Sequence, residues 1–195
     1  MRIRRLKDED LAIRVEWVNN PKIHKTMHFE VPITIEGTKK WFSKVSDSHD
    51  RVDFAFETEG KLCAMGGFTS INSEPELYIF VAPNNKGNGI GLMATSLLCE
   101  YGFMHLHLNK IILYTNGDNI PAQRTYQRLG FKLLSVEHDA AHNGGYWIAS
   151  TCALKDDTDY FALHLYFLPT DDGGFYFNCT GTNRYDGRPI RPVSY

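Results

Sequence analysis

The chain has 195 residues, of which 43% are hydrophobic and 23% are charged, and its formal net charge is −2 with a pI near 6.4. This length suits one domain with a sizeable core and leaves room for an appendage. The near-neutral charge argues against generic binding to nucleic acids or anionic membranes, so we expect neither as a partner. The basic amino terminus is not followed by an apolar stretch and no apolar run approaches membrane-spanning length, so we expect a cytoplasmic protein without a signal peptide.

The cysteine pattern gives no sign of a redox or metal framework. Cys63, Cys99, Cys152 and Cys179 form neither a CxxC pair nor a closely spaced set. An intracellular chain keeps such thiols reduced, so we interpret them as small hydrophobic residues. We expect no metal ion in the protein.

The first third of the chain predicts two helices. Asp8 can cap a helix whose apolar residues recur at helical spacing, and this helix ends before Pro21. Residues 21–35 are expected to form a loop, and 36–45 are expected to form the second helix.

The rest of the chain alternates strands and helices after an initial hairpin. Two apolar runs flank the turn Glu59-Gly60 and predict the hairpin. This order indicates a mixed α/β arrangement with an antiparallel front half and a strand–helix–strand–helix back half. The expected elements are strands at 52–56, 62–65 and 76–81, a helix at 89–105, a strand at 110–114, a helix at 119–129, and strands near 131–138 and 145–154.

A glycine-rich stretch at 81–91 joins an apolar strand to an amphipathic helix. Because Gly87, Gly89 and Gly91 lack Cβ atoms, backbone N–H groups can converge there on an anion beside the positive end of the helix dipole. This predicts a site for a diphosphate-bearing cofactor. A dinucleotide fingerprint would need glycine in place of Leu92, and a Walker loop would need Lys and Ser or Thr after Gly91, so both fail. A glycine turn without any ligand is the remaining alternative.

A second patterned stretch follows at 119–131. Together the two segments resemble the GNAT superfamily of acyl-CoA-dependent N-acetyltransferases, and the resemblance covers roughly residues 1–154. The family's cofactor signature, Q/R-x-x-G-x-G/A, is matched at 86–91, except that Lys86 replaces the usual Gln or Arg. The family's second pattern, Asn-x-x-Ala-x-x-x-Tyr-x-x-x-Gly-Phe, is met at Asn119, Ala122, Tyr126, Gly130 and Phe131.

The resemblance implies a fold, a cofactor and the residues that bind it. The fold would be a GNAT-like mixed, mostly antiparallel central sheet flanked by helices, with an aromatic-rich extension at the carboxyl end. Acetyl-CoA would be the acyl donor. In the family, backbone N–H groups on the strand before the glycine loop bind the thioester oxygen where a bulge splays that strand from its neighbour. The residues expected to bind the cofactor are Phe80 and Val81 at the thioester, Lys86, Gly87, Asn88, Gly89, Ile90, Gly91 and Leu92 at the pyrophosphate, and Asn119 and Tyr126 beyond them.

Acyl transfer to an amine also needs a base and an acid. Tyr126 matches the family's general acid, which protonates the leaving thiolate. Its alternative is a core tyrosine on an amphipathic helix. Glu76 lies where related enzymes carry a glutamate that accepts the proton of the amine, here through a water. A solvated glutamate at a strand start is the alternative, and Glu74 is a nearby rival.

The acceptor side is less well determined by the sequence. Residues 17–21 followed by Met27 resemble the branch that includes ribosomal-protein N-terminal, spermidine and amino-sugar nucleotide acetyltransferases. In that branch the first two helices and their connection line the acceptor cleft. A polyamine would need several carboxylates, and only Glu30 and Glu36 are obvious, so we favour a small amino-sugar or amino-acid-like amine, or a peptide N-terminus. The residues expected near the acceptor are Trp17, His24, His28, Phe29 and Glu30.

The resemblance stops after Leu154. Residues 155–195 are rich in aromatic side chains, which argues against a disordered tail and predicts an ordered hairpin or small sheet addition. This segment would pack on the domain or on a second subunit of a homodimer. Two functional hypotheses remain open, a catalytic acetyl-CoA-dependent N-acetyltransferase and a non-catalytic acyl-CoA-binding or protein-interaction module on the same scaffold.

Overall fold

The computed structural model describes the chain except for residues 28, 86, 140–144, 154–160, 170–174 and 184–195. The chain divides into two compact units, Met1–Cys152 and Ala153–Tyr195. The elements in chain order are β1 (Arg2–Arg5), the 3-10 helix η1 (Asp8–Asp10), α1 (Leu11–Asn19), α2 (Pro21–Met27), α3 (Ile35–Val45), β2 (Val52–Thr58), β3 (Lys61–Thr69), β4 (Glu76–Val81), α4 (Ile90–Met104), β5 (Lys110–Asn116), α5 (Ile120–Arg128), β6 (Lys132–Asp139), β7 (Gly145–Ala153), β8 (Phe161–Pro169) and β9 (Phe175–Asn183).

A seven-stranded sheet runs in the order β1-β2-β3-β4-β5-β7-β6. Strands β1 to β4 pair antiparallel in sequence order, β4 and β5 pair parallel, and β6 and β7 pair antiparallel. The hairpin turn between β2 and β3 has positive φ at Glu59 and Gly60, which suits the right-handed twist of the two strands. The predicted mixed, mostly antiparallel sheet flanked by helices is confirmed.

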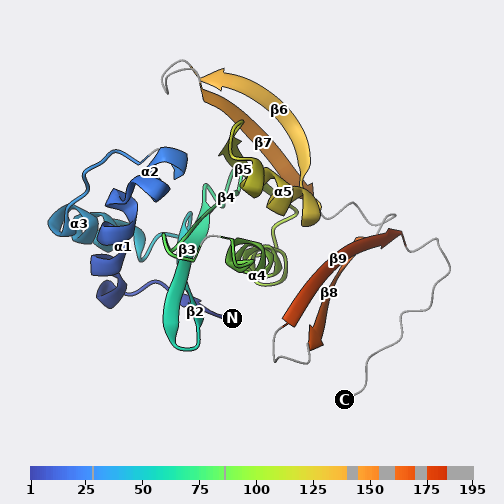
Figure 1. Ribbon diagram of the computed structural model, residues 1–195, viewed down its shortest axis with the longest axis horizontal. Helices are drawn as coiled ribbons and strands as arrows, with labels where there is room; N and C mark the ends of the chain where they lie inside the picture. Colours follow the sequence, from blue (N-terminus) through green and yellow to red (C-terminus); the bar gives the residue numbers. More distant parts are fainter. Residues whose placement is uncertain (28, 86, 140–144, 154–160, 170–174, 184–195) are drawn as a thin grey trace. The chain divides into compact units, whose positions relative to one another are not determined.

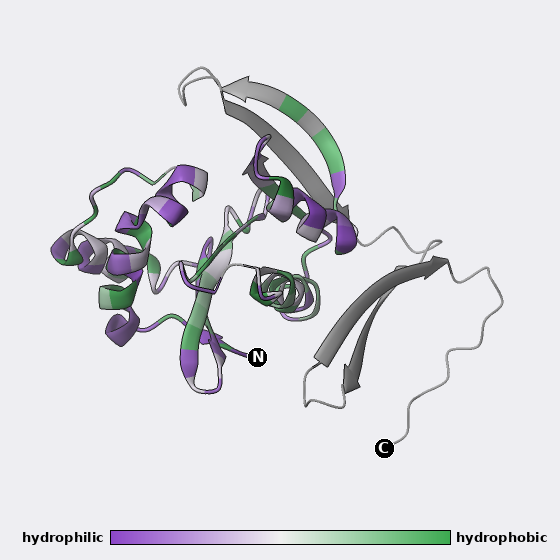
Figure 2. Cartoon of the chain, in the orientation of Figure 1, coloured by the Kyte–Doolittle hydropathy of each residue, from purple (hydrophilic) through white to green (hydrophobic). Residues whose placement is uncertain are grey.

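The helices divide between the two faces of this sheet (Figure 1). On one face Phe80 and Met65 join a core cluster with α1 and α2, and Trp41 and Phe42 of α3 pack against it. On the other face α4 packs closely, because a Cβ added at Gly102 would lie 2.9 Å from the Phe68 ring. The sequence of α4 is correspondingly apolar along most of its length, whereas α3 and α5 mix polar and apolar residues (Figure 2).

The amino-terminal part of the chain differs from the expectation in two ways. Residues 21–27 were expected in a loop but form α2, which Asn20 caps by accepting the Lys22 N–H at 3.0 Å, with Pro21 at the first helical position. The strand β1 was not predicted, because three of its four residues are arginines. It exists because it pairs with β2 along its whole length, from Arg2 opposite Glu57 to Arg5 opposite Phe54.

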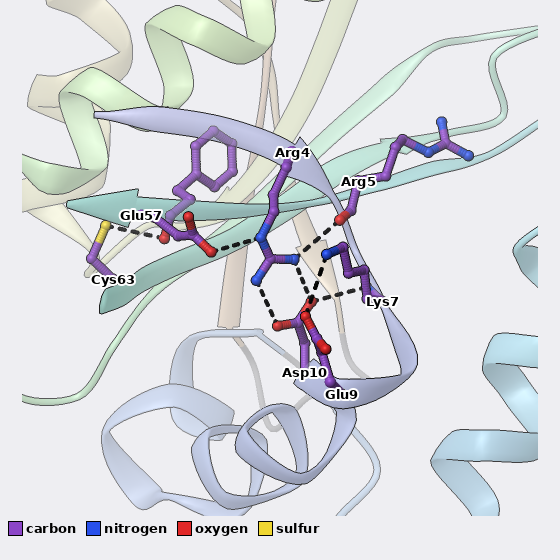
Figure 3. A network of polar contacts seen from close by, with 8 residues as sticks. Arg4, Arg5, Lys7, Glu9, Asp10, Glu57 and Cys63 are labelled. Atoms are coloured by element: carbon purple, nitrogen blue, oxygen red, sulfur yellow. Dashed lines mark hydrogen bonds and ion pairs between the residues drawn. The ribbon is translucent and has the colours of Figure 1, made fainter. Parts of the chain in front are cut away.

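An ion-pair network anchors β1 to the start of the first helix (Figure 3). The Arg4 guanidinium lies between two carboxylates and donates to both Asp10 oxygens at 2.7 and 2.8 Å and to Glu57 at 2.6 Å. Asp10 also accepts the Lys7 N–H at 2.9 Å. Burial opposes the charge of Asp10, but the hydrogen bonds from Arg4 and Lys7 hold its pKa below the ordinary value. The network therefore joins β1, β2 and η1 through the Arg4 guanidinium.

The second unit contains a two-stranded sheet of its own. In it β8 and β9 pair antiparallel, from Phe161 opposite Asn183 to Pro169 opposite Phe175. The expected domain boundary after residue 154 falls outside the described residues.

Candidate active site

The sheet opens between its two parallel strands. Within the fully described strands β4 and β5, the register contains a single pair, Glu76 opposite Ile112. The Ile112 N–H donates to the Pro75 carbonyl at 2.9 Å at the same end. In contrast, β3 and β4 stay paired from Thr69 opposite Glu76 to Ala64 opposite Val81. The strands β4 and β5 therefore separate towards their carboxyl ends, beside the glycine loop.

Two backbone donors on β4 face this opening. The Ala82 N–H donates to the Cys63 carbonyl at 2.9 Å. Because the direction of N–H groups alternates along a strand, Phe80 also points its N–H at β3, whereas Ile79 and Val81 point theirs at the β5 side. We expected a bulge on β4, and this expectation is wrong, because the β3–β4 register runs without a shift. Phe80, expected as a thioester donor, lies in the β3 ladder, and the sequence reasoning missed Ile79.

The glycine loop ends in the helix that the sequence predicts. Gly89 takes the left-handed conformation at the N-cap of α4 with φ +72°, and Gly87 has φ +93°. A Cβ at either position would meet no protein atom within 4 Å, so packing does not exclude a side chain there. Asn88 is exposed, Ile90 is buried, and Gly91 and Leu92 are half-buried, whereas Lys86 lies outside the described residues. The first-turn N–H groups of α4 and an open glycine backbone thus meet at one place, as an anion site requires.

The end of α5 fixes the position of Tyr126. Gly130 takes a left-handed conformation with φ +86°, and its N–H donates to the Gln127 carbonyl at 3.1 Å. The Phe131 N–H donates to the Tyr126 carbonyl at 3.0 Å, which completes a Schellman motif. The Tyr126 side chain lines a pocket with Leu113 and Thr115 of β5, on the same face as α4, and with Gln123, Gln127, Phe131 and Leu133.

The phenol of Tyr126 is held in its protonated form. Burial and the neighbouring Cys99 of α4 raise the pKa of Tyr126 to about 12. Asn119 occupies the N-cap position of α5, but its side chain makes no capping hydrogen bond. A protonated phenol and an amide side chain that does not cap the helix therefore lie towards the two ends of α5.

Glu76 lies on the opposite face of the sheet from Tyr126. Successive strand residues alternate faces, so Glu76, Tyr78 and Phe80 share the face of α1 to α3, where Phe80 belongs to the core cluster. Glu76 is half-buried. Burial raises the pKa of its carboxyl above the ordinary value, and the charge of Arg51 opposes this increase. Its rival Glu74 is exposed and pairs with Lys110 at 3.0 Å.

A polar cluster on this face was missed by the sequence reasoning. Arg51 donates two hydrogen bonds of 2.9 Å to Asp53, and the Tyr78 hydroxyl also donates to Asp53. Arg14 of α1 is only 6% exposed, and its guanidinium carbon lies 4.4 Å from the centroid of the Trp41 ring. A signal existed in the sequence, because Arg14 interrupts the apolar positions of the first helix and Asp53 interrupts an apolar strand.

Of the residues expected near the acceptor, Trp17 and Phe29 belong to one hydrophobic cluster. Trp17 is 8% exposed and belongs to the core cluster, whereas Glu30 is exposed. His24 is half-buried on α2, and His28 lies outside the described residues. Phe29 lies at the polar cluster, with its ring centroid 5.8 Å from that of Phe80 in a T-shaped contact.

A sheet that opens between two parallel strands and a glycine loop that leads into a helix are compatible with an acyl-CoA-dependent acyltransferase. A family model described as "Acetyltransferase (GNAT) domain" matches residues 1–132. The chain therefore belongs to the GNAT acetyltransferase family. It is an acyl-CoA-dependent N-acetyltransferase.

Named relatives and solved structures resemble parts of the chain to different extents. Spermidine N(1)-acetyltransferase of Escherichia coli K12 is 29% identical over 155 residues, which cover 75% of this chain and 81% of that protein. The mycothiol acetyltransferase of Mycobacterium leprae is 37% identical, but over 32% of this chain and 22% of its own length. The crystal structure of spermidine N-acetyltransferase from Vibrio cholerae with CoA and spermine superposes with a TM-score of 0.72 at 22% identity, over 78% of this chain and 94% of that one. An aminoglycoside acetyltransferase in complex with coenzyme A shares the fold with a TM-score of 0.66 at 17% identity, covering 77% and 93% of the two chains.

Membrane spans and metal clusters are both absent from the described part of the chain. None of its helices has the length and apolar character needed to span a membrane. Within the same residues, no three His, Cys, Asp or Glu side chains are grouped so that they could hold a metal ion.

Proposed function

We propose that the protein transfers the acetyl group of acetyl-CoA directly to a primary amine, with the donor bound on the α4–α5 face of the sheet and the acceptor on the α1–α3 face. One observation supports this most strongly. Tyr126, a protonated phenol, and Glu76, a carboxyl with a raised pKa, lie on opposite faces of the sheet, with Glu76 at the amino end of β4 where this strand still pairs with β5. An acid on the donor face and a base on the acceptor face suit a transfer between the two faces, with Glu76 acting through a water.

The cofactor contacts follow from the open backbone. The N–H groups at the start of α4 and the Gly87–Gly91 loop would bind the pyrophosphate, with Lys86 adding a positive charge. Asn119 would contact the pantetheine arm. The N–H groups of Val81 and Ile79 would donate to the thioester oxygen, where negative charge develops as the amine attacks.

Glu76 and Tyr126 would carry the two proton transfers of the reaction. The neutral amine nitrogen attacks the thioester carbon, and Glu76 accepts through a water the proton that this nitrogen loses as the amide forms, and later releases it to solvent. The carbon–sulfur bond breaks, and the Tyr126 phenol gives its proton to the departing sulfur. Solvent returns a proton to the phenolate. No acyl group is attached to the protein at any step.

The charges of the acceptor face favour a small amine over a polycation. Asp53 is already neutralised by Arg51 through two hydrogen bonds, and Arg14 adds a second positive charge beside it. Glu76 is then the carboxylate of the described part of β4 that could serve an amine on this face, and Glu30 and Glu36 are too few to bind a polycation. We therefore propose a small amino-sugar or amino-acid-like amine, or a peptide N-terminus, as the acceptor.

Spermidine is the second candidate, because the relative from Escherichia coli, 29% identical, is named as a spermidine N(1)-acetyltransferase. The test is the consumption of acetyl-CoA across a panel of amino acids, amino sugars, short peptides and polyamines, with the acetylated product identified by mass. Lines that intersect in double-reciprocal plots support direct attack, whereas parallel lines would indicate an acyl-enzyme. A clear preference for spermidine would overturn the proposed acceptor class, and the absence of turnover with every amine would overturn the proposed function.

A further inference from the structure

Arg14 is a buried cation on the acceptor face of the sheet. It sits on the inward side of α1, three residues after Leu11 and three before Trp17, and is 6% exposed. Its guanidinium carbon lies 4.4 Å from the ring centroid of Trp41 and 5.5 Å from those of Phe29 and Phe80. These rings come from α3, from the segment after α2 and from β4, so three separate parts of the acceptor face surround one charge.

The described residues do not neutralise this charge. Asp53 is the carboxylate that acts on Arg14 electrostatically, and it is already bound by Arg51 and by the Tyr78 hydroxyl. The Nη1 atom of Arg14 is buried and has no hydrogen-bond partner among the residues that the structure describes. A guanidinium keeps its charge and its N–H donors at any physiological pH, so the N–H groups of Nη1 still require a hydrogen-bond acceptor. Attraction to the three rings recovers part of the cost of burial but cannot satisfy an N–H group in this geometry.

The position of Arg14 relative to the opening between β4 and β5 limits which ligand could accept a hydrogen bond from its Nη1 atom. Phe80 precedes Val81 on β4, at the end of the strand where the sheet opens. Phe29 and Trp41 are half-buried, so the aromatic cluster reaches the surface while Phe80 closes its inner side. An acceptor whose amine enters the opening would therefore hold its other end near these rings.

We propose that Nη1 of Arg14 binds a carboxylate of the acceptor, so that the acceptor is an amino acid or a similar amine bearing a carboxylate. This inference rests on the proposed function, because it assigns a subsite within the same acceptor face. A carboxylate carries one charge and is planar, which matches one cation enclosed by flat rings. A phosphate would bring more charge and more oxygens than the two N–H groups of this one nitrogen can serve.

The decisive experiment compares each amino acid with its carboxamide as the acceptor, for the full-length wild type, Arg14→Met and Arg14→Lys. Methionine replaces the charge with an apolar chain of similar length, which a buried ion site often tolerates. We expect the wild type to prefer the carboxylate at least tenfold in kcat/KM. Arg14→Met should remove that preference through a raised acceptor KM while leaving kcat and the KM for acetyl-CoA nearly unchanged. Arg14→Lys should recover part of the preference, because lysine keeps the charge but not the fork.

Arg5→Met is the matched control. Arg5 also lies over a ring, 5.8 Å from the centroid of Phe54, but Phe54 contacts Tyr101 of α4 on the opposite face. The control should keep the wild-type preference.

A binding measurement separates this inference from the proposed function. Carboxylates that lack the amine, such as the deaminated analogue of the best acceptor, should raise the melting temperature of the wild type and of Arg5→Met but not of Arg14→Met. This result would support the subsite even if no amine were acetylated. Equal use of carboxylate and carboxamide together with an equal thermal response in Arg14→Met would overturn the subsite while leaving acetyl transfer intact. A preference for phosphate-bearing amines that depends on Arg14 would overturn the assignment to a carboxylate.

Discussion

The backbone N–H of Phe131 donates to the carbonyl oxygen of Tyr126 at 3.0 Å, and the centroids of their two rings lie 5.8 Å apart. Both contacts exist because Gly130, between them, adopts the left-handed conformation that ends the helix. The family pattern Tyr-x-x-x-Gly-Phe is therefore a structural unit that fixes one tyrosine at the edge of the opening. Replacing Gly130 or Phe131 would displace Tyr126 without touching its hydroxyl.

Tyr126→Phe tests the proposed proton donor. Because the pKa of Tyr126 is raised to about 12, the phenol is protonated across the useful assay range. We expect kcat to fall about 10- to 1000-fold, with the affinity for acetyl-CoA unchanged. The loss should shrink with a thioester whose thiol is more acidic, since such a leaving group needs less help. Tyr101→Phe on α4 is the control, and an unaltered kcat in Tyr126→Phe would return this residue to a packing role.

Gly89→Asn tests the cofactor cradle. Asparagine tolerates a positive φ better than most residues, so its side chain enters the loop at a small backbone cost. We expect the rise in melting temperature caused by acetyl-CoA to disappear. Gly60→Asn is a matched control, because Gly60 has φ +73° against +72° for Gly89, and a Cβ added at Gly60 would likewise meet no atom within 4 Å. If both variants respond to acetyl-CoA like the wild type, the pyrophosphate does not bind at this loop.

Glu76→Gln separates catalysis from stability. The pKa of Glu76 is raised in the folded protein, so the folded state binds its proton more tightly than the unfolded state does. Stability therefore falls as the pH rises from the unfolded pKa through the folded pKa, and neutral glutamine avoids this loss. We expect Glu76→Gln to melt no lower than the wild type at pH 8, while its kcat/KM falls and loses the acidic limb of the pH profile, where activity rises as this carboxyl loses its proton. The exposed Glu74→Gln should change neither quantity, and an equal loss of activity in both variants would exclude a specific role for Glu76.

Asp10→Asn tests the ion-pair network of β1. Removing one partner of a buried pair leaves the other unpaired, so we expect a loss of about 3 kcal/mol in the free energy of unfolding. The pKa of Asp10 is lowered, so its contribution is present above the unfolded pKa and is lost as the pH falls through the folded pKa. Urea unfolding of the wild type and the variant should therefore converge in acid. Glu9→Gln removes an exposed pair at 3.4 Å and should cost almost nothing.

Truncation after Lys155 tests the carboxyl-terminal extension. Its aromatic residues bring apolar area whose burial is worth about 25 cal/mol per Å², set against the entropy of ordering the segment. We expect the shortened protein to melt lower, aggregate more or change its oligomeric state, and still to bind acetyl-CoA. Equal stability, with rapid proteolysis of the extension in the full-length chain, would show that the extension is disordered.

The sequence predicted best what local rules determine. The helices α4 and α5 follow from glycine spacing and helix-end residues, and the hairpin follows from Glu59-Gly60. Strand β1 was not predicted because its partners cannot be read from the local sequence. It pairs with β2, about 50 residues further along the chain. Its Arg4 contacts Glu57 of β2 and the buried Asp10. Helix α2 was missed although Asn20 and Pro21 are a recognisable cap and first residue.

The candidate site divides in the same way. Tyr126 and the glycine loop lie in short contiguous patterns. The direction of the Ile79 and Val81 N–H groups depends on register with β3, and the surroundings of Arg14 come from three elements distant in sequence. Such arrangements arise only when the chain has folded, so a single sequence could not specify them.

The two faces of the sheet also differ in how freely they can change. On the proposed mechanism, the α4–α5 face must preserve one donor, whereas the helices α1 to α3 meet only the acceptor. Substitutions in α1 to α3 could thus retune acceptor choice while the acetyl-CoA site stays intact. The partition makes this scaffold readily evolvable, and it recommends libraries confined to α1 to α3 for redirecting the enzyme to new amines.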